Sequence, residues 1–292
     1  MQITSVSGRT YQVGKQIGQT EHHRIYECTL PDGQPAILKI ALETSDNSSL
    51  DHEAVIIRIM TEEAKLLEAE FAETSEAKEH PEIRLNYHFY FPALIESFIA
   101  DEQGGRRINV VAFPNVAKKL VELVPILHLT TRDRIRIDPR TSAWILGKLL
   151  KMLGFTHNLN IEIGNLSGDN ILINREGHFV AVFDWTGAKF ADGALSDGVK
   201  AKEISQVTRA VVVALGGDPE TGELLEDAQL PDEKYRELLQ KLLSEGEASA
   251  KQAHGDFYRL VYGQWPREYH PFTAYPLDEF GGSEETVEEE EK

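Results

Sequence analysis

Residues 165–173 read NLSGDNILI, and residues 183–185 read FDW. The first stretch is a polar, glycine-containing loop that enters an apolar strand, and the second ends the strand that returns after a turn at residues 174–178. Asn170 and Asp184 therefore stand at neighbouring ends of one predicted hairpin, with an amide oxygen near a carboxylate. Oxygen ligands of this kind suit a Mg²⁺ ion that also binds a substrate phosphate. The alternative is that both side chains only cap turns.

The residues before this hairpin predict a small β-rich lobe. Apolar runs separated by turn residues indicate five strands, at residues 11–17, 24–30, 36–40, 91–98 and 108–113. Between the third and fourth strands, apolar residues three and four positions apart predict one helix at about residues 51–69. The lobe therefore combines a sheet with a single helix.

Two charged residues interrupt the apolar pattern of this lobe. The predicted buried stripe of the helix contains Ile56, Ile59 and Met60, and Glu63 lies on the same stripe. A buried carboxylate needs a cationic partner, because an unpaired charge is costly to remove from water. Lys39, in the third strand, is the predicted partner. The alternatives are a lysine that reaches solvent from an edge strand, and a rotated helix that leaves Glu63 exposed.

Most of the chain after residue 113 predicts helices. Asp138 and Pro139 supply a cap and a first helical residue, and leucines at helical spacing follow them. Further helices are expected near residues 203–215 and 232–244, and a last one reaches Tyr262.

The sequence as a whole predicts an α+β fold with two lobes. The β-rich lobe occupies residues 1–113, and a mainly helical lobe occupies residues 114–280 and contains the hairpin of residues 165–184. Residues 281–292 carry six glutamates and are expected to form a disordered acidic tail.

Composition narrows the function classes further. The 292 residues contain 30 Lys and Arg against 48 Asp and Glu, and a net charge of −18 argues against nucleic acid or an anionic membrane as a partner. Cys28 is the one cysteine, so an internal disulfide is excluded. The polar N-terminus and the lack of a long apolar run lead us to expect a cytoplasmic protein without a signal peptide.

Over roughly residues 10–272, the order of elements and the residues quoted above resemble the protein kinase fold. The resemblance implies that Lys39 holds the α and β phosphates of ATP and pairs with Glu63. It also implies that Asn170 and Asp184 hold Mg²⁺.

The resemblance further implies that Gly18 and Phe113 belong to the nucleotide site, with a hinge between the lobes at about residues 113–117. An Asp-Trp pair with no glycine after it is more similar to aminoglycoside-type kinases and other divergent, bacterial-style members.

The strand-turn where the family has a glycine-rich loop departs from the family pattern. Only Gly18 of the three expected glycines is present, and Thr20 and His23 occupy the other two positions. Bulkier residues limit how closely backbone amides approach phosphates, and Glu21 adds charge of the wrong sign. His22 and His23 are not expected to bind one metal ion together, since adjacent residues on a strand point to opposite faces.

The predicted catalytic loop departs more seriously. Asn165 stands where the family has the aspartate that accepts a proton from the substrate hydroxyl, and a neutral amide cannot hold that proton. Asp169 is an alternative base, but it lies next to Asn170, on another part of the loop. The segment between Asp184 and Glu203 is short and leaves little platform for a peptide, and Glu203 stands where the next helix would start with a buried Asp.

These departures predict a pseudokinase that binds ATP and Mg²⁺ and acts by binding or scaffolding, with a nucleotide and a protein as its partners. The first alternative is a weakly active phosphotransferase that acts on a protein hydroxyl or a small molecule. The second is an interaction module that has lost nucleotide binding.

Overall fold

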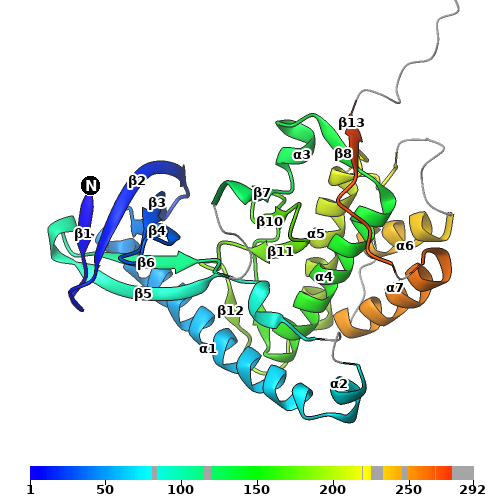
Figure 1. Cartoon of the computed structure of the whole chain (residues 1–292), viewed down its shortest axis with the longest axis horizontal. Coiled ribbons are helices and arrows are strands. Elements are labelled where there is room, and N and C mark those ends of the chain that lie inside the picture. The colour runs from blue at the N-terminus through cyan, green and yellow to red at the C-terminus, as the bar shows by residue number, and fades with distance from the viewer. Residues whose placement is uncertain are drawn as a thin grey trace, which may run out of the picture.

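The computed structural model describes residues 1–80, 84–114, 120–218, 220–224, 233–244, 249–266 and 268–277. Figure 1 shows a curled sheet, made by the first part of the chain, beside a larger helical lobe. The predicted α+β fold with a β-rich and a helical lobe is confirmed. The predicted tail at residues 281–292 lies outside the described residues, as does most of the predicted hinge.

The N-terminal sheet has six antiparallel strands in the order β1-β2-β3-β4-β6-β5. Their bounds are β1 Gln2–Thr4, β2 Thr10–Gln19, β3 His23–Thr29, β4 Pro35–Ala41, β5 Ala93–Ala100 and β6 Arg106–Ala112. The five predicted strands are present, and β1 is an addition: its Ile3 is fully buried in the apolar cluster of this sheet. β4 is buried along almost its whole length, so Lys39 lies in the interior of the sheet and not at an edge.

Helix α1, Asn47–Ala72, crosses beneath the sheet toward the helical lobe (Figure 1). Its buried face includes Leu50, Glu53 and Ile57, whereas Ile59 is 37% exposed and Glu63 is partly exposed. The predicted stripe was therefore wrong in its rotation, and the carboxylate that α1 buries belongs to Glu53.

The shorter helical elements of this half of the chain are α2 Ser75–Glu79 and the 3₁₀ turns η1 Thr44–Asp46, η2 Tyr87–Phe89, η3 Asp101–Gln103 and η4 Leu120–Glu122.

The second lobe is built on the helices α3 His128–Thr131, α4 Pro139–Asn158, α5 Asp197–Ala214, α6 Glu233–Ser244 and α7 Ala250–Gln264. α4 begins as predicted, since the Asp138 side chain accepts a hydrogen bond from the Thr141 N–H at 2.8 Å. The helix is buried along most of its length and forms the centre of this lobe. No helix in the described ranges is both long and apolar enough to span a bilayer.

The predicted hairpin supplies two strands of a three-stranded sheet, in the order β11-β10-β7, with β10 in the middle. Its strands are β7 Leu123–Pro125, β10 Ile171–Asn174 and β11 Phe179–Val182. Two further pairs join distant segments: β9 Ile161–Glu162 with β12 Lys189–Phe190, and β8 Ile135–Ile137 with β13 Ala274–Pro276.

One apolar cluster runs through both lobes. It contains Ile57 and Met60 of α1, Phe91, Trp185 after the hairpin and Leu146 of α4. Because this cluster is continuous, α1 packs against the helical lobe as well as against its own sheet. This packing holds α1 and the end of the hairpin in place, and both carry side chains of the polar site described next.

Candidate functional site

A buried cluster of three charged side chains joins the two lobes. The Lys39 Nζ donates to Oε1 of Glu53 at 2.5 Å and to Oδ1 of Asp184 at 2.7 Å. Lys39 and Glu53 are completely buried. Burial alone would lower the pKa of Lys39, but the two carboxylates outweigh that effect and its pKa is raised. The lysine is therefore held in its charged form.

Glu53 connects its own helix, α1, to three other segments of the chain through its two oxygens. Besides Lys39 of β4, Oε1 accepts the backbone N–H of Trp185 at 3.1 Å, and Oε2 accepts Nδ2 of Asn109, on β6, at 3.0 Å. The predicted pairing of Lys39 with Glu63 is wrong, because the rotation of α1 turns Glu53 inward. The sequence carried a signal for this residue, since Glu53 lies three positions after Leu50 and four before Ile57.

Asp184 uses both of its carboxylate oxygens within the protein. Oδ1 accepts from Lys39, and Oδ2 accepts from the hydroxyl of Thr186 at 2.9 Å. Burial raises the pKa of Asp184, but the charge of Lys39 and these hydrogen bonds outweigh it and lower the pKa to about 2. The carboxylate is thus ionised, and each of its oxygens accepts one hydrogen bond from the protein.

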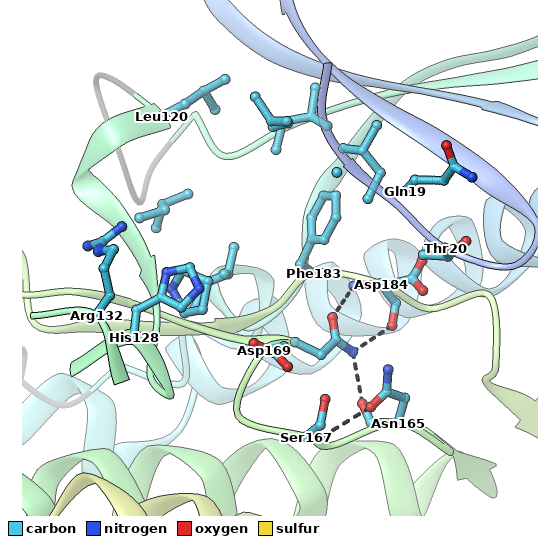
Figure 2. Close-up of a pocket in the computed structure, with 18 residues that line it drawn as sticks. Gln19, Thr20, Leu120, His128, Arg132, Asn165, Ser167, Asp169, Phe183 and Asp184 are labelled. Atoms are coloured by element: carbon cyan, nitrogen blue, oxygen red, sulfur yellow. Dashed lines mark hydrogen bonds between the residues drawn. The ribbon is translucent and has the colours of Figure 1, made fainter. Parts of the chain in front are cut away.

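Asn170 is also engaged on both sides of its amide. Oδ1 accepts the backbone N–H of Asp184 at 2.7 Å, and Nδ2 donates to the carbonyl oxygens of Asn165 and Asp184 at 2.8 and 3.0 Å (Figure 2). The prediction that Asn170 and Asp184 lie together agrees with this geometry. Their oxygens have the right chemistry for Mg²⁺. As arranged here, each of these oxygens accepts one hydrogen bond from the protein, and the cation on the Asp184 carboxylate is the Lys39 ammonium.

Glu203 of α5 holds the loop before Asn170 through its backbone. Oε1 of Glu203 accepts the backbone N–H groups of Ile163 at 2.6 Å and Gly164 at 3.0 Å, and Oε2 lies 3.0 Å from Nε2 of His157. Gly164 has φ +81°, and a Cβ there would lie 2.6 Å from the carbonyl oxygen of Gly187. The loop conformation therefore requires glycine and a buried acid. That acid lies within α5, which begins at Asp197 and not, as expected, near Glu203.

Asn165 and Asp169 lie on the exposed side of the same loop. The side-chain oxygen of Asn165 accepts the backbone N–H of Ser167 at 3.1 Å, which closes a local turn. Asp169 presents an exposed carboxylate (Figure 2). A carboxylate is thus present near the loop, but not at the position that Asn165 occupies.

A cleft of about 610 Å³ separates the two lobes above this loop. Five of the predicted site residues line it: Gly18, Asn165, Asp169, Asn170 and Asp184.

Three of the predicted site residues do not line this cleft. Lys39 is buried behind it, and Glu63 lies farther along α1. Phe113 is buried, and its ring centroid lies 6.5 Å from that of Phe183, which does line the cleft.

The opposite wall of the cleft was not predicted. His128 and Arg132, on and just after α3, face it from the side away from Thr20 and Asp184 (Figure 2). No pattern in the sequence marked these two residues, because α3 is a single short turn whose place depends on the strand β7 before it.

Comparisons with known proteins agree with the fold. No family model matches the chain, and no curated protein sequence matches it either. Among solved structures, it is similar to the autoinhibited serine kinase domain of the giant muscle protein titin, with a TM-score of 0.58 and 13% identity over 91% of this chain and 85% of that one. It is also similar to vaccinia related kinase 3, with a TM-score of 0.54 and 12% identity over 90% of each chain. At these identities the likeness shows the fold, which is protein kinase-like.

Proposed function

We propose that this protein is a pseudokinase: a kinase-like fold that binds a nucleotide-type ligand in the cleft between its lobes and acts through binding, without phosphoryl transfer. The observation that carries the proposal is the amide of Asn165 at the position of the catalytic base. Its oxygen accepts the N–H of Ser167, and a neutral amide cannot accept a proton from a hydroxyl at neutral pH. Proton abstraction of this kind contributes about 10² to 10⁴-fold to rate.

The ion pairs of the site support the proposal that its charged residues hold the two lobes together. Lys39, Glu53 and Asp184 bind one another and tie α1 to the hairpin. A ligand in the cleft would contact both lobes and stabilise their closed arrangement by binding it in preference to an open one. A protein partner that recognises this arrangement would then sense whether the cleft is filled.

The test combines a thermal shift with a transfer assay. The full chain is heated with ATP, with and without Mg²⁺, and then incubated with ATP labelled on the γ-phosphate and a generic acceptor protein. The proposal predicts a rise in Tm and no labelled product. Transfer that is abolished by Lys39→Met would overturn it in favour of an enzyme. No shift with any adenine compound would favour an interaction module without nucleotide binding.

The second candidate function is a weak phosphotransferase with Asp169 as its base. The observation in its favour is that this carboxylate is exposed and lines the same cleft. Phosphoryl transfer relies mainly on positioning and electrostatic stabilisation, so a displaced base would slow the reaction without abolishing it. This candidate predicts slow transfer that Asp169→Asn removes and Asp101→Asn, on the far end of the N-terminal sheet, does not.

A further inference from the structure

A second cavity, of about 370 Å³, is formed by three segments of the chain. They are the second half of α1, the residues that lead into the start of β5, and the two residues that follow β6. None of the residues described for this cavity also lines the cleft between the lobes. It is therefore a separate site, and its volume is that of an ordinary small-molecule pocket.

Part of the lining of this cavity is apolar. Phe91 and Phe113 contribute two aromatic side chains that are each only 3% exposed, and Ala93 and Pro114 complete this part. An apolar group gains free energy when it leaves water for such a surface, and a flat ring adds favourable contacts with the aromatic rings. The apolar part therefore suits an aromatic ligand group.

The polar part of the lining contains one cation that is held only weakly. Both oxygens of Glu68 are engaged with His88: Oε1 accepts its backbone N–H at 3.2 Å, and Oε2 lies 2.8 Å from its Nδ1. Lys65 instead pairs at 2.8 Å with Glu62, which does not line the cavity, and the two side chains are 65% and 69% exposed. Such exposed pairs contribute little free energy. The Lys65 ammonium can therefore bind an anionic ligand group instead.

The two aromatic side chains also connect the cavity to the residues on either side of Asp184. The Phe91 ring packs edge-to-face against Trp185, with centroids 6.2 Å apart, and the Phe113 centroid lies 6.5 Å from that of Phe183. A ligand that packs on these two rings is thus one residue contact away from both neighbours of Asp184. Its binding should be felt at the end of the hairpin.

We propose that this cavity binds a small aromatic carboxylate. The ring of the ligand fills the space beside Phe91 and Phe113, and its carboxylate pairs with the ammonium of Lys65. Because the ligand contacts α1, β5 and the end of β6 together, it stabilises the arrangement in which α1 brings Glu53 to Lys39. The site goes beyond the proposed function, since it does not depend on what the cleft binds.

Titration calorimetry on the full chain tests the proposal, with 2-naphthoate and its neutral counterpart 2-naphthamide as probes. The wild type is expected to bind 2-naphthoate about threefold or more tightly than 2-naphthamide. Lys65→Met is expected to remove this difference, because the carboxylate loses its partner. Lys78→Met is the matched control, since Lys78 is also exposed, pairs with the exposed Glu73 and does not line the cavity. It is expected to change neither affinity.

Substitutions that fill the cavity test where the probes bind. Ala93→Met extends a side chain from β5 into the space, and it is expected to weaken the binding of both probes about tenfold or more. Ile99→Met, on the same strand but outside the cavity, is the matched control. Thr61→Met fills the cavity from α1 and replaces Ala93→Met if thermal melts show that Ala93→Met does not fold.

Fluorine NMR of the chain labelled with 5-fluorotryptophan locates the bound probe without any change to the cavity. The chain has three tryptophans, Trp144, Trp185 and Trp265, and Trp144→Phe and Trp265→Phe assign the three signals. Saturating 2-naphthoate is expected to shift the signal of Trp185, which packs against Phe91, and to leave the other two in place. Trp144 and Trp265 line a different cavity, between α4 and α7, and their signals report binding there.

Four results would overturn the proposal. They are no binding of either probe, equal affinities that Lys65→Met leaves unchanged, full affinity in folded Ala93→Met and Thr61→Met proteins, and a shift confined to Trp144 and Trp265. None of them bears on the proposed function, because Lys65, Ala93 and Thr61 do not line the cleft between the lobes.

Discussion

The buried cluster around Lys39 and the loop around Asn165 meet at one end of the same hairpin, through Asn170, and they differ in the groups that they contain. The cluster has a full set of charges, with Glu53 and Asp184 on the lysine. The loop is held by Glu203 at its backbone, and it carries the amide of Asn165 where the proposed function expects a base to act. The comparison teaches that the contacts which assemble a kinase-like fold are separable from the groups that move a proton. In this protein the charged residues serve the assembly.

The largest expected effect comes from breaking the cluster. Glu53→Ala leaves Lys39 and the neighbouring N–H donors without an acceptor, and loss of one partner of a buried ion pair costs about 3 to 5 kcal/mol. Glu63→Ala, on the partly exposed side of α1, is the matched control and is expected to change stability by less than about 0.5 kcal/mol. Urea unfolding measures both. Equal effects would mean that α1 buries a different face.

The next effect is a dependence of stability on pH that comes from His23, beside the buried cluster. Burial, with the positive charge of Lys39, lowers the pKa of His23 from 6.5 to about 4, while Asp184 opposes that shift. The unfolded state therefore takes up a proton before the folded state does, so stability is fully present above pH 6.5 and is lost as the pH falls toward 4. At pH 5, the lowered pKa of His23 reduces the free energy of unfolding by about 2 kcal/mol relative to neutral pH.

The variant that checks this is His23→Gln, which is neutral at every pH. Its free energy of unfolding, measured in urea at pH 7 and pH 5, should fall by less than that of the wild type between the two values. His22→Gln, whose side chain is exposed, should behave like the wild type. If His23→Gln and the wild type lose the same stability, His23 is not buried in its neutral form.

A smaller effect is expected in the loop. Glu203→Gln keeps the shape of the side chain but loses the charge that accepts from Ile163, Gly164 and His157, and hydrogen bonds to a charged group are worth about 1.5 to 3 kcal/mol. Because Glu203 and Glu53 share none of these partners, the double variant with Glu53→Gln should be additive within about 0.5 kcal/mol. A larger coupling energy in urea unfolding would show that the cluster and the loop form one unit.

Much of this arrangement follows from the sequence, and the exceptions have physical causes. The hairpin, the five strands of the sheet and the cap at Asp138 depend on local pattern and were predicted. The face of α1 was not, because Ile56 and Met60 belong to two overlapping stripes that differ only in Ile57 or Ile59. Periodicity alone cannot choose between them, and the choice decides whether Glu53 or Glu63 meets Lys39.

Features that depend on contacts between distant segments could not be predicted from the sequence either. The two- and three-residue strands of the helical lobe exist because distant segments pair, such as β8 with β13. The opposite orientation of His22 and His23 was predicted from strand geometry. That the inward ring is His23, fixed above Asp184 by the hydroxyl of Thr20, depends on the hydrogen bonds of one turn.

The most direct test of the central claim is transfer of the γ-phosphate from ATP by the wild type and by Asn165→Asp in one assay. Asn165→Asp restores a carboxylate at the base position with almost no change in shape. The wild type is expected to give no transfer above the rate without protein, and a gain in Asn165→Asp of up to about 10² to 10⁴-fold would show that the lost base is what separates this protein from an active kinase. Transfer by the wild type above the rate without protein would contradict the account.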